Sequence, residues 1–241
     1  MKQNTNVTVH NIQTESLDEQ SQREVNALIG QYAYDLYPIP CSPTEQLVTV
    51  VKAYVQTHAA VHLHFVGCTN GPFGRPMVAI AVNGQSQLIG AICYSAPTVE
   101  PVILLRCCVV AEDHRNKGVL RALMEKILTA FPAARLSCHP ELVPVYEKFG
   151  FAVTGMSGTE VTMETHEAAE YSSVEIPNPP EHIILNQESY LAAIVVLRDT
   201  LSPFDYNNIN ANQLKARRLE QKRVHSFVES RLGRKIQLEP I

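Results

Sequence analysis

A short basic turn that contains a glycine stands between two apolar segments near the middle of the chain. The apolar run at 102–110 is typical of a strand, and the apolar positions of 119–131 recur at helical spacing. The unpaired amides of a first helical turn attract anions, and Gly118 lets the backbone approach one closely. Basic side chains add to the positive end of the helix dipole. The predicted phosphate site consists of Arg115, Asn116, Lys117, Gly118, Val119, Leu120 and Arg121.

A second distinctive segment, 136–151, follows this helix and ends in Tyr146-Glu147-Lys148-Phe149-Gly150-Phe151. Together the two segments resemble the GNAT superfamily of acetyltransferases. The first is similar to the pyrophosphate-binding motif Gln/Arg-x-x-Gly-x-Gly/Ala, from which Leu120 departs, and the second to the segment that ends in Tyr-x-Lys-x-Gly-Phe. The second segment is most similar to the arylalkylamine N-acetyltransferase branch. The chain lacks GxGxxG and GxxxxGK followed by Ser or Thr, so coenzyme A is favoured over a dinucleotide or ATP.

The resemblance implies an N-acetyltransferase that uses acetyl-CoA as a co-substrate and needs no metal. In the family, a tyrosine at the position of Tyr146 protonates the departing CoA thiolate, and a phenol that is neutral at pH 7 has its proton available. The acceptor, an amine of a small molecule or a peptide, attacks the thioester directly. The resemblance further implies cofactor contacts by Cys108, Val109, Val110 and His139, and acceptor contacts by Tyr34, Asp35 and Tyr37.

The base that deprotonates the amine is not identified by the resemblance. The arylalkylamine enzymes use a histidine pair on the fourth strand, where this chain has Leu104 and Arg106. Glu100, His139 or a chain of water molecules could serve instead. Leu120 and the missing histidines also leave open a second function, a sensor or scaffold that binds acyl-CoA without transferring the acyl group.

The order of the predicted elements agrees with the resemblance. Apolar periodicity gives a strand, two helices, three strands, a helix, a strand, a short helix and two strands. Ser16 or Asp18 is the expected cap of the first helix, Asn83-Gly84 the expected hairpin bend, and Gly150 the expected end of the short helix. The expected fold class is α/β (α+β), with a GNAT-type mixed central sheet flanked by helices and a C-terminal helical appendage.

Composition divides the chain into three parts. A polar segment with Pro177, Pro179 and Pro180 is typical of an exposed connector. In the last part, Asn212 and Gly233 are the expected ends of a second helix. We expect a GNAT-like acyl-CoA-binding catalytic domain at 1–165, a proline-rich linker at 166–181 and a helical C-terminal extension at 182–241, with helices at 187–201 and 212–232.

Positive charge is concentrated in this extension. Residues 212–235 carry eight Lys or Arg against two acidic side chains, so their charge is +6 and that of the rest of the chain is −10. We favour a helix that packs its apolar side, with Leu214, Val224 and Val228, on the catalytic domain. Binding of nucleic acid or of an acidic partner is the alternative. The sequence leaves open whether the protein is a monomer or a homodimer.

Several other classes of function have little support in the sequence. No apolar run approaches the roughly 20 residues of a membrane span, and the polar N-terminal segment resembles no secretory signal. We therefore expect a cytoplasmic protein without a membrane partner. The six cysteines include no CxxC pair and are expected to be reduced and buried. His62 and His64 alternate on a possible strand, but two ligands without a third do not make a metal site.

Overall fold

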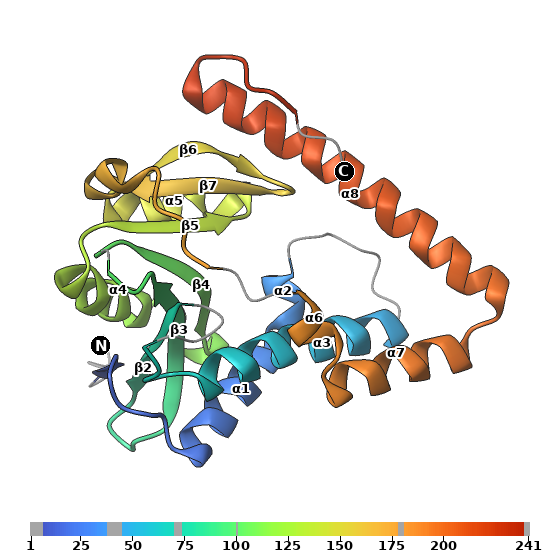
Figure 1. Cartoon of the computed structure of the whole chain (residues 1–241), viewed down its shortest axis with the longest axis horizontal. Helices are drawn as coiled ribbons and strands as arrows, with labels where there is room; N and C mark the ends of the chain where they lie inside the picture. Colours follow the sequence, from blue (N-terminus) through green and yellow to red (C-terminus); the bar gives the residue numbers. More distant parts are fainter. Residues whose placement is uncertain (1–6, 38–44, 70–73, 100, 178–180, 239–241) are drawn as a thin grey trace.

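A seven-stranded mixed sheet with helices on both faces forms the centre of the molecule (Figure 1). The computed structural model describes residues 7–37, 45–69, 74–99, 101–177 and 181–238. Across the sheet the strands are β1 (Thr8–Ile12), β2 (Arg75–Val82), β3 (Leu88–Ala96), β4 (Ile103–Val110), β5 (Ala134–Cys138), β7 (Glu160–Thr165) and β6 (Phe151–Ser157). Neighbouring strands are antiparallel except β4 and β5, which are parallel. The predicted mixed sheet is confirmed.

Helices cover both faces of β2 and β3 because these strands are apolar on both sides. On β2, Met77 faces the core with α4 (Val119–Ala130), whereas Val78 faces the core with α1 (Glu19–Gln31) and α3 (Glu45–His64). Both side chains are fully buried. Successive side chains of a strand point to opposite faces, so a strand that is buried on both faces has a continuous apolar run.

Three local signals are confirmed where the sequence predicted them. The Asp18 carboxylate caps α1 by accepting a 2.9 Å hydrogen bond from the Ser21 amide. The Asn83 side chain closes the β2–β3 bend by accepting one from the Gln85 amide, also at 2.9 Å. Gly150 ends the short helical segment before β6 with φ +86°. That segment consists of η2 (Pro140–Leu142), α5 (Val143–Tyr146) and η3 (Glu147–Phe149).

Helix α3 includes the two histidines that the sequence suggested for a strand. His62 and His64 lie in its last turn. His62 is 1% exposed, and its Nε2 lies 3.0 Å from the carbonyl oxygen of Met77 on β2. Burial lowers the pKa of His62 to about 3, so the ring is neutral. The strand assignment is wrong because Leu63 continues the helical spacing of Ala59, and both pack in one core cluster.

The first part of the predicted linker is packed rather than exposed. A 3-10 helix, η4 (His166–Tyr171), follows β7 and buries Ala168 in a small core cluster with Val102. Arg135 on β5 donates a 2.8 Å hydrogen bond to the carbonyl oxygen of Val174. The sparse apolar residues of this segment cover one edge of the sheet, which its polar composition concealed.

Three helices form the C-terminal extension: α6 (Glu181–Leu185), α7 (Glu188–Thr200) and α8 (Pro203–Leu232). Helix α8 begins earlier than expected because Ser202, not Asn212, caps it. The Ser202 hydroxyl accepts a 3.1 Å hydrogen bond from the Asp205 amide, and the proline that follows the cap suits a first helical position. Gly233 ends α8 with φ +64°, as predicted. No helix within the described ranges has the length and apolar content needed to cross a membrane.

The C-terminal half of α8 packs against β6 and β7, while the rest of the helix extends away from the sheet (Figure 1). Val224 and Val228 are fully buried in the main core, so the predicted packing is confirmed for this half. Leu214 is 42% exposed and takes no part in that core.

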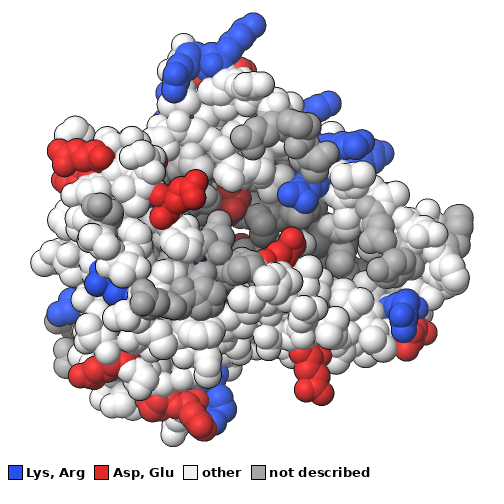
Figure 2. Space-filling view, viewed as in Figure 1, with Lys and Arg blue, Asp and Glu red and all other residues white. Residues whose placement is uncertain are grey.

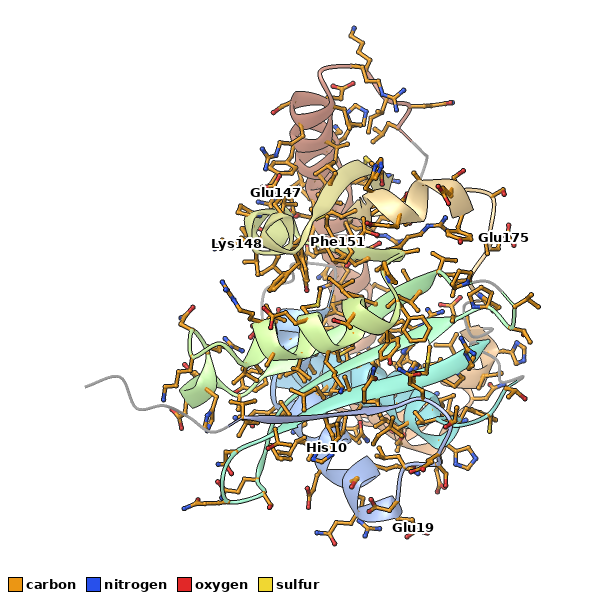
Figure 3. The ribbon with its side chains drawn as sticks, turned by 90° about the vertical axis from the view of Figure 1, so that its left-hand side faces the viewer. His10, Glu19, Glu147, Lys148, Phe151 and Glu175 are labelled. Carbon is orange, nitrogen blue, oxygen red and sulfur yellow. The ribbon has the colours of Figure 1, made fainter. Side chains whose placement is uncertain are left out.

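Two arginines of α8 form ion pairs with the short helical segment before β6. Arg223 Nη1 lies 2.5 Å from Glu141 Oε1, and its Nη2 lies 2.5 Å from Glu220 Oε1 within α8. Arg231 Nη2 lies 2.6 Å from Oε1 of Glu147, which Figure 3 labels beside Lys148 and Phe151. The extension is therefore fastened to the segment on both sides of Tyr146.

Candidate active site

Strands β4 and β5 pair only over their first residues and then separate. Their pairing ends at Leu105 and Leu136, although β4 continues to Val110. At the same point the pairing of β4 with β3 skips Arg106, which is the geometry of a bulge. A bulge bends its strand, so β4 turns away from β5 and an opening forms between them.

The backbone amides of Cys108 and Val110 face this opening. On β4 and its continuation, the Ala111 amide donates a 2.9 Å hydrogen bond to the carbonyl oxygen of Ile89 on β3. Amides alternate in direction along a strand, so those of Cys108 and Val110 point away from β3. Because β5 does not pair with this part of β4, these amides are available to a ligand in the opening.

Arg106, at the bulge, is held from two sides. Its Nε donates a 2.7 Å hydrogen bond to Ser95 Oγ, and its Nη2 donates another to the Pro177 carbonyl oxygen. Burial lowers the pKa of Arg106 to about 10, so the side chain is still cationic at neutral pH. An anchored cation cannot replace the basic histidine of the arylalkylamine branch.

The predicted phosphate site is an open turn at the start of α4. Asn116 and Gly118 have φ of +60° and +86°, and a Cβ added to Gly118 would meet nothing within 4 Å. Gly118 occupies the N-cap position and gives α4 no side-chain hydrogen bond. The Leu120 side chain packs partly buried against the main core, as Val119 does fully, while Lys117 and Arg121 are exposed. The first amides of α4 are thus free of a capping side chain.

Arg115 connects this turn with the N-terminal helices. Its Nε donates a 3.2 Å hydrogen bond to the Val110 carbonyl oxygen, and its guanidinium lies 4.6 Å from the centre of the Tyr32 ring. Its Nη2 lies 3.6 Å from Oδ2 of Asp35. A predicted cofactor residue and a predicted acceptor residue therefore lie in contact.

Tyr146 lies beside the opening and contacts β4. Tyr146 and Cys108 line the same pocket, and the Tyr146 ring lies 6.1 Å from that of Phe151. Burial raises the pKa of Tyr146 well above its ordinary value, so the phenol keeps its proton at neutral pH. Burial likewise raises the pKa of Cys108 to about 12. Val109 lies between Cys108 and Val110, and its side chain is buried against the opposite face of the sheet.

A pocket of about 80 Å³ brings several of these groups together. Four predicted site residues, namely Cys108, Tyr146, His139 and Asp35, line it. His139 is half-buried, and its Nε2 lies 3.4 Å from the Tyr37 carbonyl oxygen. The pocket therefore joins the end of β4 to the start of the short helical segment.

The remaining predicted acceptor residues lie outside this small pocket. Tyr37 lines a second pocket of about 440 Å³, where its ring lies 6.1 Å from that of Tyr54. Tyr34 is half-buried on α2 (Ala33–Leu36). Glu100, one of the suggested bases, lies outside the described residues.

Glu160 is a candidate that the sequence did not reveal. It begins β7 and lines both pockets. Burial raises the pKa of its carboxyl group, while nearby His139 acts in the opposite direction. In the sequence it is a lone acidic residue after a Gly-Thr turn, and only the pairing of β7 with β5 brings it to the opening.

The cysteines and acidic residues form no metal site in the described part of the chain. No group of three or more His, Cys, Asp or Glu side chains there is placed to hold a metal ion. Cys93 and Cys138 are buried and unpaired, as expected, whereas Cys68 is exposed in the turn after α3.

Comparison with known proteins finds one family model that matches this region. The model of the acetyltransferase (GNAT) family matches residues 36–151. No curated protein matches the chain in sequence. Among solved structures, PaiA N-acetyltransferase from Thermoplasma acidophilum, in complex with coenzyme A, is 14% identical with a TM-score of 0.50, over 66% of this chain and 98% of that protein.

Two further solved structures are similar to parts of the chain. An acyl-CoA N-acyltransferase from Pseudomonas aeruginosa is 15% identical with a TM-score of 0.48, over 66% of this chain and 99% of that one. Nourseothricin acetyltransferase is 18% identical with a TM-score of 0.35, over 37% of this chain and only 64% of its own length. The Thermoplasma structure shows that the fold is that of a GNAT protein. Residues 36–151 match the acetyltransferase (GNAT) family, and the chain is an acyltransferase.

Proposed function

We propose that this chain transfers the acetyl group of acetyl-CoA to a primary amine of a small molecule or a peptide. The observation that best supports this reaction is the opening between β4 and β5, where the amides of Cys108 and Val110 point away from β3 and Cys108 and Tyr146 line one pocket. A thioester needs hydrogen-bond donors for its carbonyl oxygen and an acid for its sulfur, and the opening offers both. The open turn at Gly118 suits the diphosphate of the co-substrate.

The transfer is direct in this proposal. The amine nitrogen attacks the thioester carbon while the amides of β4 stabilise the negative charge on oxygen. The carbon–sulfur bond then breaks with its electron pair on sulfur, and Tyr146 supplies the proton for the thiolate. That the related structure from Thermoplasma acidophilum contains coenzyme A supports this choice of co-substrate.

Replacing Tyr146 by Phe tests the assignment. We expect kcat to fall on the order of 100-fold, because the variant keeps the ring but loses the proton donor. The affinity for acetyl-CoA, measured by calorimetry, should stay within two-fold of the wild-type value. Tyr171→Phe, in the connector, is the matched control and should change neither quantity. Unchanged turnover of the Tyr146→Phe protein contradicts the role of Tyr146.

The acceptor class is tested with wild-type protein and a panel of polyamines, aryl amines, amino acids and peptides. Thiol release from acetyl-CoA is followed for each compound. Release that depends on one class of amine supports the proposed reaction, and the absence of release with every compound contradicts it.

A further inference from the structure

The pocket that Tyr37 lines is larger than the small pocket at Tyr146 and adjoins it. We call this pocket of about 440 Å³ the acceptor chamber. Glu160 lines both pockets, so the chamber and the catalytic opening share one wall. Figure 2 shows both acidic and basic side chains around a hollow in this face of the molecule.

The walls of the chamber come from two different parts of the chain. Helix α3 and the turn between β6 and β7 contribute one side, which includes Tyr54 and Glu160. The C-terminal extension contributes the other side, with Glu181 of α6, Tyr190 of α7 and Arg217 of α8. The family match ends at residue 151, so most of the residues that line the chamber, including all four from the extension, lie beyond the matched region.

Three tyrosines form a continuous aromatic row along the chamber. The ring of Tyr54 lies 6.1 Å from that of Tyr37 and 5.7 Å from that of Tyr190, with edge-to-face geometry in both pairs. Burial, and secondarily the nearby charge of Glu181, raises the pKa of Tyr54. Aromatic rings beside carboxylates attract organic cations, because ring faces and carboxylates are both negative. An organic amine with an apolar body and one cationic end is therefore suited to this wall of the chamber.

Glu160 is placed to receive a proton at the junction of the two pockets. In the described part of the chain its carboxylate forms no ion pair and no hydrogen bond, so its oxygens are not committed to a structural partner. The ionisable groups that share the two pockets with it include Asp35, Arg106, Cys138, His139, Tyr146, Glu181 and Arg217. A carboxylate whose pKa is raised by burial is a stronger base than one in water.

We infer that the C-terminal extension completes an acceptor site for a primary amine on an apolar body, and that Glu160 is the base that deprotonates this amine. The inference rests on the proposed function. The ammonium nitrogen gives one proton to the Glu160 carboxylate, and the lone pair that is released forms the carbon–nitrogen bond. When the amide forms, the nitrogen loses a second proton, which returns through water to the Tyr146 oxygen that protonated the sulfur. The Glu160 proton leaves to solvent, so the net products are an amide, free CoA and one proton.

The base is tested by Glu160→Gln, with hexylamine as the probe amine. We expect kcat to fall on the order of 100-fold with unchanged affinity for acetyl-CoA. In the plot of kcat against pH, the fall at acidic pH, which reports protonation of the Glu160 carboxylate, should disappear. Glu170→Gln, an exposed position in the connector, is the matched control. Turnover within two-fold of wild type in the Glu160→Gln protein overturns the assignment of the base.

The contribution of the extension is tested by Glu181→Gln, with Glu188→Gln on α7 as its control. We expect the KM for hexylamine to rise about five-fold, since a partly exposed charge pair contributes modestly, while kcat and the affinity for acetyl-CoA hold. Hexanoate, which reverses the charge of the probe, should not compete. Competition by hexanoate, or an unchanged KM, overturns the acceptor site. If wild-type protein binds no acetyl-CoA, or acetylates none of the amines, the proposed function fails and this inference fails with it.

Discussion

The turn that is suited to phosphate and the acceptor chamber are built in opposite ways. The turn is one continuous stretch, from the end of β4 to the first residues of α4, and its geometry follows from two residues with positive φ, Asn116 and Gly118. The chamber collects single side chains from segments as far apart as Tyr37 and Arg217. A site that binds a constant part of the co-substrate can be encoded locally. A site that is assembled from distant elements depends on how the whole chain folds.

The largest effect is expected from a substitution that disrupts only the turn at Gly118. Gly118→Asp places a negative charge where the helix dipole and the open turn favour an anion, so the affinity for acetyl-CoA should fall on the order of 100-fold. Gly150→Asp is the control, because Gly150 has the same φ of +86° and equally open surroundings. Both variants should lose about 1 kcal/mol of stability from backbone strain. Calorimetric titration with CoA separates them, and equal loss of affinity in both contradicts the phosphate site.

The next largest effect concerns the acceptor chamber. Arg223→Ala leaves Glu220, which is 7% exposed, without its cation and releases Glu141, so stability to urea should fall by about 2 kcal/mol. Because α8 also provides Arg217 to the chamber, the KM for the amine should rise in this variant. The affinity for acetyl-CoA should not change. A fall in the affinity for CoA without a change in the KM for the amine would show that α8 supports the phosphate turn and not the chamber.

A smaller effect tests how much folding stability is lost by burying the charged carboxylate of Glu160. Burial raises the pKa of Glu160, so folding disfavours its charged form. The stability that a neutral carboxyl group contributes is present in acid and is lost as pH rises through the folded-state pKa. Glu160→Gln should therefore raise Tm by about 3 °C at pH 8, and this gain should vanish below the ordinary carboxyl range. Thermal melts of both proteins across this pH range measure it. A Tm for Glu160→Gln below that of wild type at pH 8 contradicts the burial cost.

The smallest effect belongs to the exposed ion pair of α8 and η3. Arg231 and Glu147 are each 40% exposed, so Arg231→Ala should cost less than about 1 kcal/mol. The loss should shrink in high salt, because screening weakens exposed pairs. Urea melts at low and high ionic strength provide the measurement, and a loss that is independent of salt argues that packing on Phe227 matters more than charge.

The sequence predicted those features whose cause is local. The cap at Asp18, the bend at Asn83 and the left-handed Gly150 each depend on neighbouring residues alone, and each is confirmed. Glu160 depends on the crossing of β7 to a position between β5 and β6, which no pattern within β7 encodes. Helix α8 was misplaced at its start because Asn212 and Ser202 are both good caps. The proline that follows Ser202 and the acidic Asp205, three residues after Ser202, distinguish them.

The contact between Arg106 and the carbonyl oxygen of Pro177 limits how far the extension can move. Pro177 is held at the bulge of β4, and Glu181 follows it by four residues. A fully extended chain of that length spans at most about 14 Å. The first acidic residue of α6 is therefore tethered to the strand that carries the amides of Cys108 and Val110. A substitution that frees the Arg106 guanidinium would lengthen this tether.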